Sequence, residues 1–182
     1  MRIFVCVFLS CLLFACADME KSDQLKRVNI LLENVDSLLI VLNQINEPQL
    51  SREIEENNKL LSDLTIRASD DTLMETEARL VDKYANYISK LSSLKIRMEN
   101  LKSALDEQKS TIGNLENDIE NVAGKRDLYD ENLNFEEKKF NLIEKEINSI
   151  KTKKIIFLDK IANFKIKIRE SMQKLELKQI TQ

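Results

Sequence analysis

A seven-residue repeat of apolar side chains fills the C-terminal half of this chain and limits what it can fold into. Alternate steps of four and three residues from Leu80 to Leu175 visit 28 positions, of which 23 are apolar. A chain with 43% apolar residues would place about 12 apolar side chains there by chance. A sustained spacing of 3.5 residues is typical of helices that pack along a supercoiled seam. The repeat therefore predicts an all-α, coiled-coil fold.

Composition also favours long helices. Only two glycines and one proline interrupt 182 residues, and 32% of the chain is charged. Folds built from strands and turns need more glycine and proline than this. We expect a long coiled-coil segment over 72–180, preceded within 24–69 by two shorter amphipathic helices. The first helix would run from 22 to 45 and the second from Pro48 to about 68, because proline is tolerated only in the first turn of a helix.

The long segment can adopt either of two arrangements. Unbroken heptad phase over 80–175 favours one continuous helix, a rod of about 144 Å, and we expect this form. The alternative is an antiparallel hairpin in which Gly124 ends one helix in the left-handed conformation and Asp127 caps the next. A rod predicts parallel self-association through the seam. A hairpin satisfies its seam within one chain and leaves its tip near Gly124 to bind a partner.

A few seam positions are polar. Gln108 or Arg126 in the seam would cost stability but would fix the register or the number of partners. The simpler interpretation is that a long repeat tolerates an occasional polar residue, and we favour it.

The N-terminus carries a second pattern. Arg2 precedes an uncharged run over 3–17, which is shorter than the roughly 20 residues of a membrane-spanning helix but typical of a signal-peptide core. The tetrad Leu13-Phe14-Ala15-Cys16 closes this run. It resembles the lipobox of bacterial lipoproteins, with Phe14 where that box commonly has a small or β-branched residue. Ordinary secretion with cleavage nearby and an uncleaved short anchor are the alternatives.

The lipoprotein resemblance implies removal of a signal peptide at 1–15 and acylation of Cys16, with fatty acids such as palmitate. Residues 16–23 would then form a lipidated polar tether, and two or more acyl chains would make membrane attachment stable. By the sorting pattern of enteric bacteria, Ala17 after the cysteine implies the outer membrane rather than the inner one. The remaining cysteines, Cys6 and Cys11, would leave with the signal peptide, so that no thiol would be left for a disulfide or a metal.

Charge is distributed unevenly. Residues 16–137 carry 15 basic and 26 acidic side chains, whereas residues 138–182 carry 12 basic and 5 acidic ones. Lys151, Lys153 and Lys154 in the basic part are candidates for contact with an anionic surface, such as cell-wall polymer, lipid headgroups or an acidic partner. The alternative is a solvated, lysine-rich helix face. We expect no nucleic-acid binding, because the aromatic side chains form no stacking platform.

The sequence predicts no catalytic, cofactor or metal site. The chain has no histidine, no glycine-rich phosphate loop, and acidic pairs only as sequence neighbours, which point about 100° apart on a helix. We therefore expect a lipid-anchored, non-catalytic envelope protein that acts as a spacer or scaffold. Its partners would be the membrane and either itself or another helical envelope protein, with no small-molecule substrate. The alternatives are a helical-hairpin adaptor of a transport or secretion assembly and, remotely, an envelope enzyme.

Overall fold

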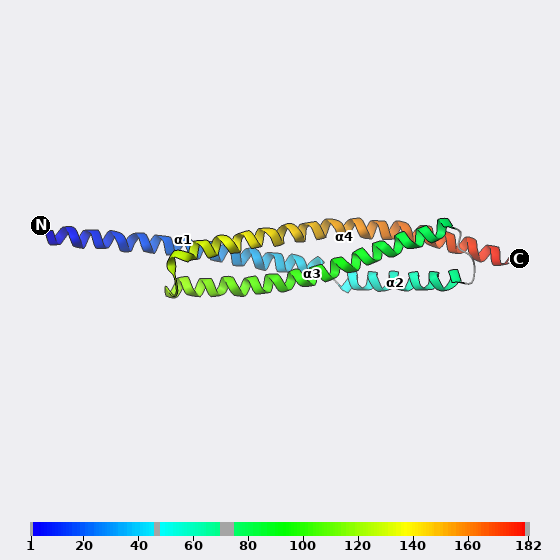
Figure 1. Ribbon diagram of the computed structural model, residues 1–182, viewed down its shortest axis with the longest axis horizontal. Coiled ribbons are helices and arrows are strands. Elements are labelled where there is room, and N and C mark those ends of the chain that lie inside the picture. The colour runs from blue at the N-terminus through cyan, green and yellow to red at the C-terminus, as the bar shows by residue number, and fades with distance from the viewer. Residues whose placement is uncertain (1, 46–47, 70–74, 181–182) are drawn as a thin grey trace. The chain divides into compact units, whose positions relative to one another are not determined.

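The computed structural model describes residues 2–45, 48–69 and 75–180, and within them the side chains of 19–45, 50–66, 78–171 and 173. Figure 1 shows the elements that these residues form: α1 (Arg2–Ile45), α2 (Pro48–Ser69), α3 (Glu75–Asn121), the 3₁₀ turn η1 (Arg126–Leu128) and α4 (Tyr129–Ile180). The described residues include no strand, so the predicted all-α fold is confirmed.

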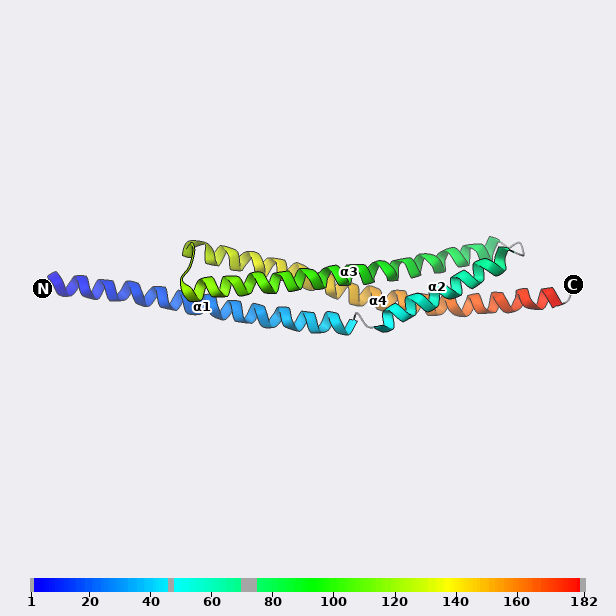
Figure 2. The ribbon, with the colours of Figure 1, turned by 90° about the horizontal axis from the view of Figure 1, so that it is seen from below.

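The long segment is a hairpin, and the expectation of one continuous rod is wrong. Helix α3 ends at Asn121 and α4 begins at Tyr129, on either side of the turn visible in Figures 1 and 2. Near the turn, the Tyr129 hydroxyl bonds to the main chain of Asp118, and farther from it Gln108 bonds to Glu136. Residues later in α4 thus pair with residues earlier in α3, so the two helices run antiparallel.

The heptad phase survives the turn because the turn is one heptad long. Residues 122–128 separate α3 from α4, and these seven residues return the seam to the same phase although the chain reverses direction. Between Leu80 and Ser171, the only exposed seam positions are Val122 and Arg126, and both lie in the turn. The rest of the seam faces other helices of the same chain, so the parallel self-association expected of a rod has no seam left to use.

Helix α1 starts earlier than expected. It is continuous from Arg2 to Ile45, so residues 17–23 are helical instead of forming a separate polar tether. Its end at Ile45 and the start of α2 at Pro48 are the expected helix boundaries. Proline suits that position because the first backbone N–H groups of a helix have no intrahelical acceptor. Cys16 therefore belongs to the same helix that continues into the protein body.

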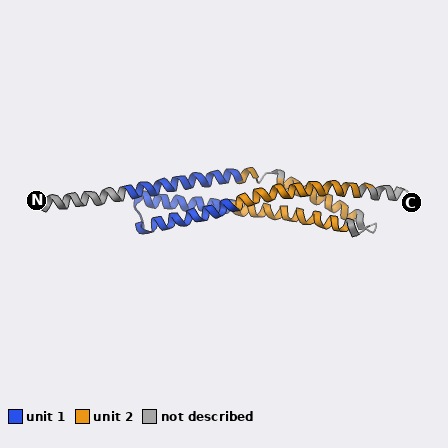
Figure 3. Ribbon diagram, turned by 90° about the horizontal axis from the view of Figure 1, so that it is seen from above, with its two compact units in different colours: residues 1–41, 102–145 blue, residues 42–101, 146–182 orange. Residues whose placement is uncertain are grey.

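The described chain divides into two compact units, coloured in Figure 3. Unit 1 comprises Met1–Val41 and Lys102–Lys145, and it packs part of α1 against the two arms beside the turn. Within it α1 runs antiparallel to α3, because Lys21 contacts Glu120 whereas Asp36 contacts Lys109. The buried apolar side chains of this three-helix bundle are Val28, Leu31, Val35, Leu105, Ile112, Leu115, Ile119, Tyr129, Leu133, Phe140 and Ile143.

Unit 2 comprises Leu42–Leu101 and Glu146–Gln182, in which α2 packs with the other halves of α3 and α4. An aromatic cluster joins the two arms here: the Tyr87 ring lies 6.0 Å from that of Phe157 and 5.6 Å from that of Phe164, centroid to centroid. Other buried apolar side chains of this unit are Leu42, Ile45, Leu50, Leu64, Tyr84, Ile88, Leu91, Leu94, Met98, Ile147, Ile150, Ile161 and Ile168.

Candidate anchoring and interaction sites

The predicted lipidation residue, Cys16, lies in α1, and its side chain is outside the described residues. It precedes Lys21 by five residues, about 7.5 Å along a helix. The Lys21 Nζ donates a hydrogen bond of 2.9 Å to the main-chain oxygen of Glu120 in the last turn of α3. That oxygen has no partner within its own helix, and a cation suits the negative end of the helix dipole. The hairpin turn therefore lies beside the part of α1 that follows Cys16.

The turn closes in a way that the sequence pattern did not predict. The Ala123 N–H donates to the Asp118 oxygen at 2.8 Å and the Val122 N–H to the Ile119 oxygen at 3.3 Å, which together form a Schellman motif. The left-handed residue that ends α3 is therefore Val122, with φ of 56°, and not Gly124. Gly124 also has positive φ, 78°, two residues later. A β-branched residue in this conformation is strained.

The expected cap at Asp127 does not form. Asp127 lies inside η1, and its side chain makes no hydrogen bond in the described part of the chain. Tyr129 fastens the turn instead, since its hydroxyl is within hydrogen-bond distance of the main-chain oxygens of Asp118, at 2.9 Å, and of Ala123. Tyr129 is a seam residue by its phase, so the pattern predicted its burial but not this bond.

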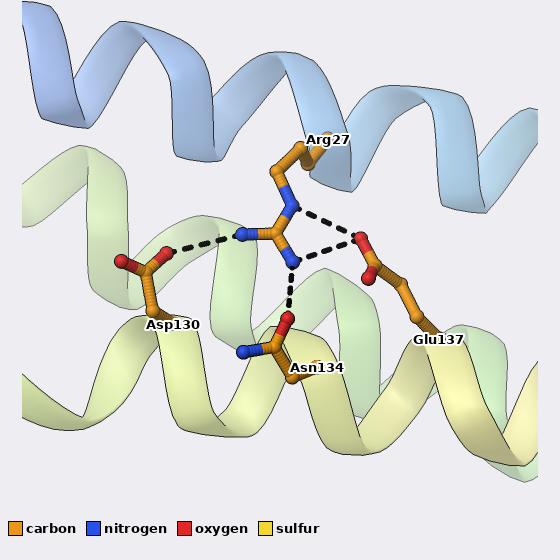
Figure 4. Close-up of polar contacts among 4 residues, drawn as sticks. All are labelled: Arg27, Asp130, Asn134 and Glu137. Atoms are coloured by element: carbon orange, nitrogen blue, oxygen red, sulfur yellow. Dashed lines mark hydrogen bonds and ion pairs between the residues drawn. The ribbon is translucent and has the colours of Figure 1, made fainter.

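Arg27 joins α1 to α4 through three acceptors (Figure 4). Its Nε donates to Glu137 Oε1 at 3.0 Å, one terminal nitrogen donates to Asp130 Oδ1 at 3.2 Å, and the other donates to Asn134 Oδ1 at 2.8 Å. The hydrogen bond that Arg27 donates to the Glu137 carboxylate is the main cause that raises the pKa of Arg27, and burial partly opposes it. The three acceptors follow each other at intervals of four and three residues on α4. This spacing places them on one side of the helix and could have indicated the site, but the predictions for this segment followed only the apolar repeat.

The three candidate lysines for an anionic surface do not share one face of α4. Lys151 is exposed, whereas Lys153 and Lys154 are half-buried. Successive residues turn by about 100° around a helix, so Lys151 and Lys153 point away from each other. Lys154 Nζ donates a 3.0 Å hydrogen bond to the Ile45 oxygen at the end of α1, the role that Lys21 has at the end of α3. The predicted basic patch is therefore divided, and one member serves the fold.

Lys154 also lines an open groove in unit 2, between α2 and α4. The groove has a volume of about 350 Å³, and its lining is Leu50, Glu53, Lys154, Leu158, Ile161, Ala162 and Lys165. Four of these seven lining residues are apolar and the other three are charged. Lys154 donates a hydrogen bond to Ile45, whereas Lys165, the other lysine of the lining, forms no hydrogen bond or ion pair in the described part of the chain.

Among the described residues, each unit contains a buried polar pair. In unit 1, Gln108 Nε2 donates to the Glu136 main-chain oxygen at 2.8 Å and to its Oε2 at 3.1 Å, while the Gln108 Oε1 atom is buried without a partner. In unit 2, the Tyr84 hydroxyl donates to Asn57 Oδ1 at 2.6 Å, and Asn57 Nδ2 bonds to Glu53. Burial raises the pKa of Tyr84 to about 12.

No family model matches this sequence, and neither a curated protein nor a solved structure matches it. By length and composition alone, one described stretch, Met19–Ile66, includes a window apolar enough to cross a membrane. Core helices of bundles pass the same test, and Val28, Leu31 and Val35 within this stretch are buried in unit 1.

Proposed function

We propose that this chain is a lipid-anchored, non-catalytic helical scaffold of a bacterial cell envelope, exported and attached through Cys16, most simply to the outer membrane. The observation that carries the proposal is the tetrad Leu13-Phe14-Ala15-Cys16 at the end of an uncharged run. All three cysteines of the chain lie at or before position 16, as expected if one is acylated and the others are removed.

The geometry of α1 supports a positioning role. Cys16 and the buried residues of unit 1, such as Val28, lie on one continuous helix, without the flexible linker that would decouple an anchor from its body. Lys21 and Arg27 then attach this helix to α3 and α4. A lipid on Cys16 would thus set the position of the bundle relative to the membrane, which is what a scaffold requires.

The polar side chains support a structural role rather than a chemical one. Arg27, Lys109 and Lys154 each contact another helix of the same unit, and their donors are directed at acceptors of the fold. Charges used in this way stabilise helix packing and offer no reacting group to a substrate. Together with the anchor motif, they favour a protein that works by being held in place.

The test is expression of the full chain in a bacterium that processes lipoproteins. We expect wild type to enter the membrane fraction with its N-terminus at an acylated Cys16, as identified by mass spectrometry of the N-terminal peptide. Cys16→Ser should retain residues 1–15 and carry no acyl group, whereas the matched control Cys11→Ser should behave like wild type. An unacylated mature wild-type protein, or an acylated Cys16→Ser variant, would refute the anchor.

A hairpin adaptor is the second candidate, and the turn is the observation that favours it. Residues 122–128 are all exposed, and Val122 holds a strained backbone conformation of the kind that clusters at functional sites. A photo-cross-linking amino acid at Lys125 in living cells should then yield an adduct of one defined mass. The same amino acid at exposed Lys102 on α3 is the control, and equal labelling at both positions would contradict a specific contact at the turn.

A further inference from the structure

Three apolar side chains form an exposed row beside the turn, hereafter the α4 row: Leu128, Phe135 and Leu142. Phe135 is 63% exposed and Leu142 is 68% exposed, although both are large. Leu128, at the end of η1, is 37% exposed. Phe135 and Leu142 are seven positions apart on α4, a drift of only about 20° around the helix, and Leu128 precedes Phe135 by the same spacing in the turn just before α4.

The α4 row is separate from every surface that the bundle already uses. The core side of this part of α4 is formed by buried residues such as Leu133 and Phe140. A second side, with Asp130 and Glu137, receives Arg27 from α1. On the helix, Phe135 points away from Leu133 by about 160° and from Glu137 by about 160° in the other direction. The row is therefore a third face, and no described residue of the chain covers it.

The charges along the α4 row differ from one end to the other. Glu131 lies on the N-terminal side of Phe135, and Lys138 and Lys139 lie on its C-terminal side. None of these three side chains forms an ion pair or a hydrogen bond within the described residues. The face thus has an acidic half and a basic half around a central phenylalanine.

This arrangement is complementary to itself when a second copy is reversed. An antiparallel copy centred on Phe135 places Leu128 against Leu142 and Glu131 against Lys139, with Lys138 next to it. A parallel copy instead places Glu131 against Glu131 and the lysines against each other, which repels. Such self-complementarity defines a two-fold, isologous interface, and the charges select its direction.

We infer that two copies of this chain associate antiparallel through the α4 row, with the two-fold axis at Phe135. Stable interfaces involve about 20–30 residues a side, far more than this row supplies. The pair is therefore expected to be weak in solution and favoured where copies are concentrated, as on a membrane. In this pair, the two α1 helices extend from the interface in opposite directions. With the proposed anchor, both lipids can therefore enter one membrane when this part of α4 lies along the membrane surface. Only this orientation rests on the proposed function; the pairing itself does not.

Disulfide trapping tests the pairing in the membranes of cells that make the full chain. In a background with Cys6 and Cys11 replaced by serine, one tagged copy carries Leu128→Cys and a differently tagged copy carries Leu142→Cys. Antiparallel pairing predicts a disulfide between the two tags, at least tenfold more abundant than the bond that either variant forms with itself. Predominant Leu128→Cys self-bonding would overturn the antiparallel pair, and no bond of either kind would overturn the α4 row as an interface.

Two further variants connect the trapped bond to the proposed contacts. Phe135→Lys should reduce the bond at least tenfold, whereas Ile155→Lys, at a 70% exposed position of α4 in unit 2, should leave it unchanged. Glu131→Lys should also reduce it, and Lys138→Glu with Lys139→Glu on the partner copy should restore it. Helicity by circular dichroism confirms folding of each variant, and insensitivity to Phe135→Lys would contradict the proposal. The background without the two added cysteines retains only Cys16 and tests the anchor separately. An acylated Cys16 has no free thiol, so this background should form no disulfide-linked pair.

Discussion

Both units bury a polar pair in the core, and the two pairs differ in whether all of their hydrogen-bonding atoms have partners. In unit 2, Tyr84 and Asn57 are both fully buried and the hydroxyl donates to the amide oxygen at 2.6 Å. In unit 1, Gln108 is fully buried and donates to Glu136, but its own oxygen has no partner. Both Tyr84 and Gln108 occupy the heptad seam, where the apolar pattern marks Gln108 as polar but does not show whether either side chain has a hydrogen-bond partner.

The difference shows how the free-energy cost of a polar core residue depends on its partners. A satisfied buried hydrogen bond contributes about 0.5–1.5 kcal/mol, whereas a buried group without a partner costs about 1–3 kcal/mol. The pair in unit 2 is therefore expected to stabilise its bundle. The pair in unit 1 is expected to cost stability while it fixes how α3 and α4 are aligned, a role known for polar residues in coiled-coil seams.

Tyr84→Phe should have the largest effect. The change leaves the Asn57 Oδ1 atom buried without its donor, so the free energy of unfolding should fall by about 1–3 kcal/mol. Tyr87→Phe is the matched control, because the Tyr87 hydroxyl forms no hydrogen bond in the described part of the chain, and we expect a change below about 0.5 kcal/mol. Urea denaturation of the two variants measures the free energy of unfolding of each. Equal decreases would show that the Tyr84–Asn57 hydrogen bond is not what stabilises unit 2.

Replacement of the whole pair in unit 1 should have the opposite sign. Gln108→Leu with Glu136→Leu removes the unpaired oxygen together with the rest of the Gln108 amide and the Glu136 carboxylate. The double variant should therefore raise the free energy of unfolding by about 1 kcal/mol. Gln108→Leu alone should lower it, because the Glu136 carboxylate then loses its donor. If the double variant is less stable than wild type, the two pairs are of similar quality and the contrast between the units fails.

The apolar repeat predicted the helices and most of the core, because helix type and burial depend on local pattern. Among the seam residues, Tyr84, Ile112 and Leu133 are all fully buried, although each was assigned from spacing alone. The same pattern did not reveal the turn, since a seven-residue connection leaves the heptad phase unchanged. Phase records which side of a helix is apolar, and it carries no information on whether the chain has reversed.

Residues that join helices were harder to predict than residues that fill the core. Arg27 and Lys154 bond to α4 and to the end of α1, respectively, and neither contact follows from sequence spacing because each depends on which helices become neighbours. The end of α3 shows a competition of another kind. Gly124 is the better left-handed residue, yet the left-handed residue that directly follows α3 is Val122, two positions earlier. The presence of a glycine nearby was therefore not enough to predict which residue ends the helix.

Val122→Gly sharpens the comparison by removing a strain that occurs in unit 1. Glycine adopts φ of 56° without the steric cost that valine has there, so the free energy of unfolding should rise by about 0.5–1 kcal/mol. Ala123→Gly is the control: among the described non-glycine residues only Val122 has positive φ, so this change should not stabilise. If both variants raise the free energy of unfolding equally, the cause is greater flexibility of the turn and not relief of backbone strain at Val122.

The smallest expected effect is a dependence on alkaline pH that belongs to unit 2. Burial raises the pKa of Tyr84 from its ordinary value of 10.0 to about 12 in the folded protein, since the apolar surroundings disfavour the charged phenolate. Because the folded pKa lies above the unfolded one, this contribution to stability is complete below pH 10 and is lost as the pH rises from 10 towards 12. Wild type should therefore lose stability more steeply over this range than Tyr84→Phe. Absorbance titration of the folded protein should show one delayed tyrosine ionisation that the variant lacks, and identical delayed signals from both proteins would contradict the assignment to Tyr84.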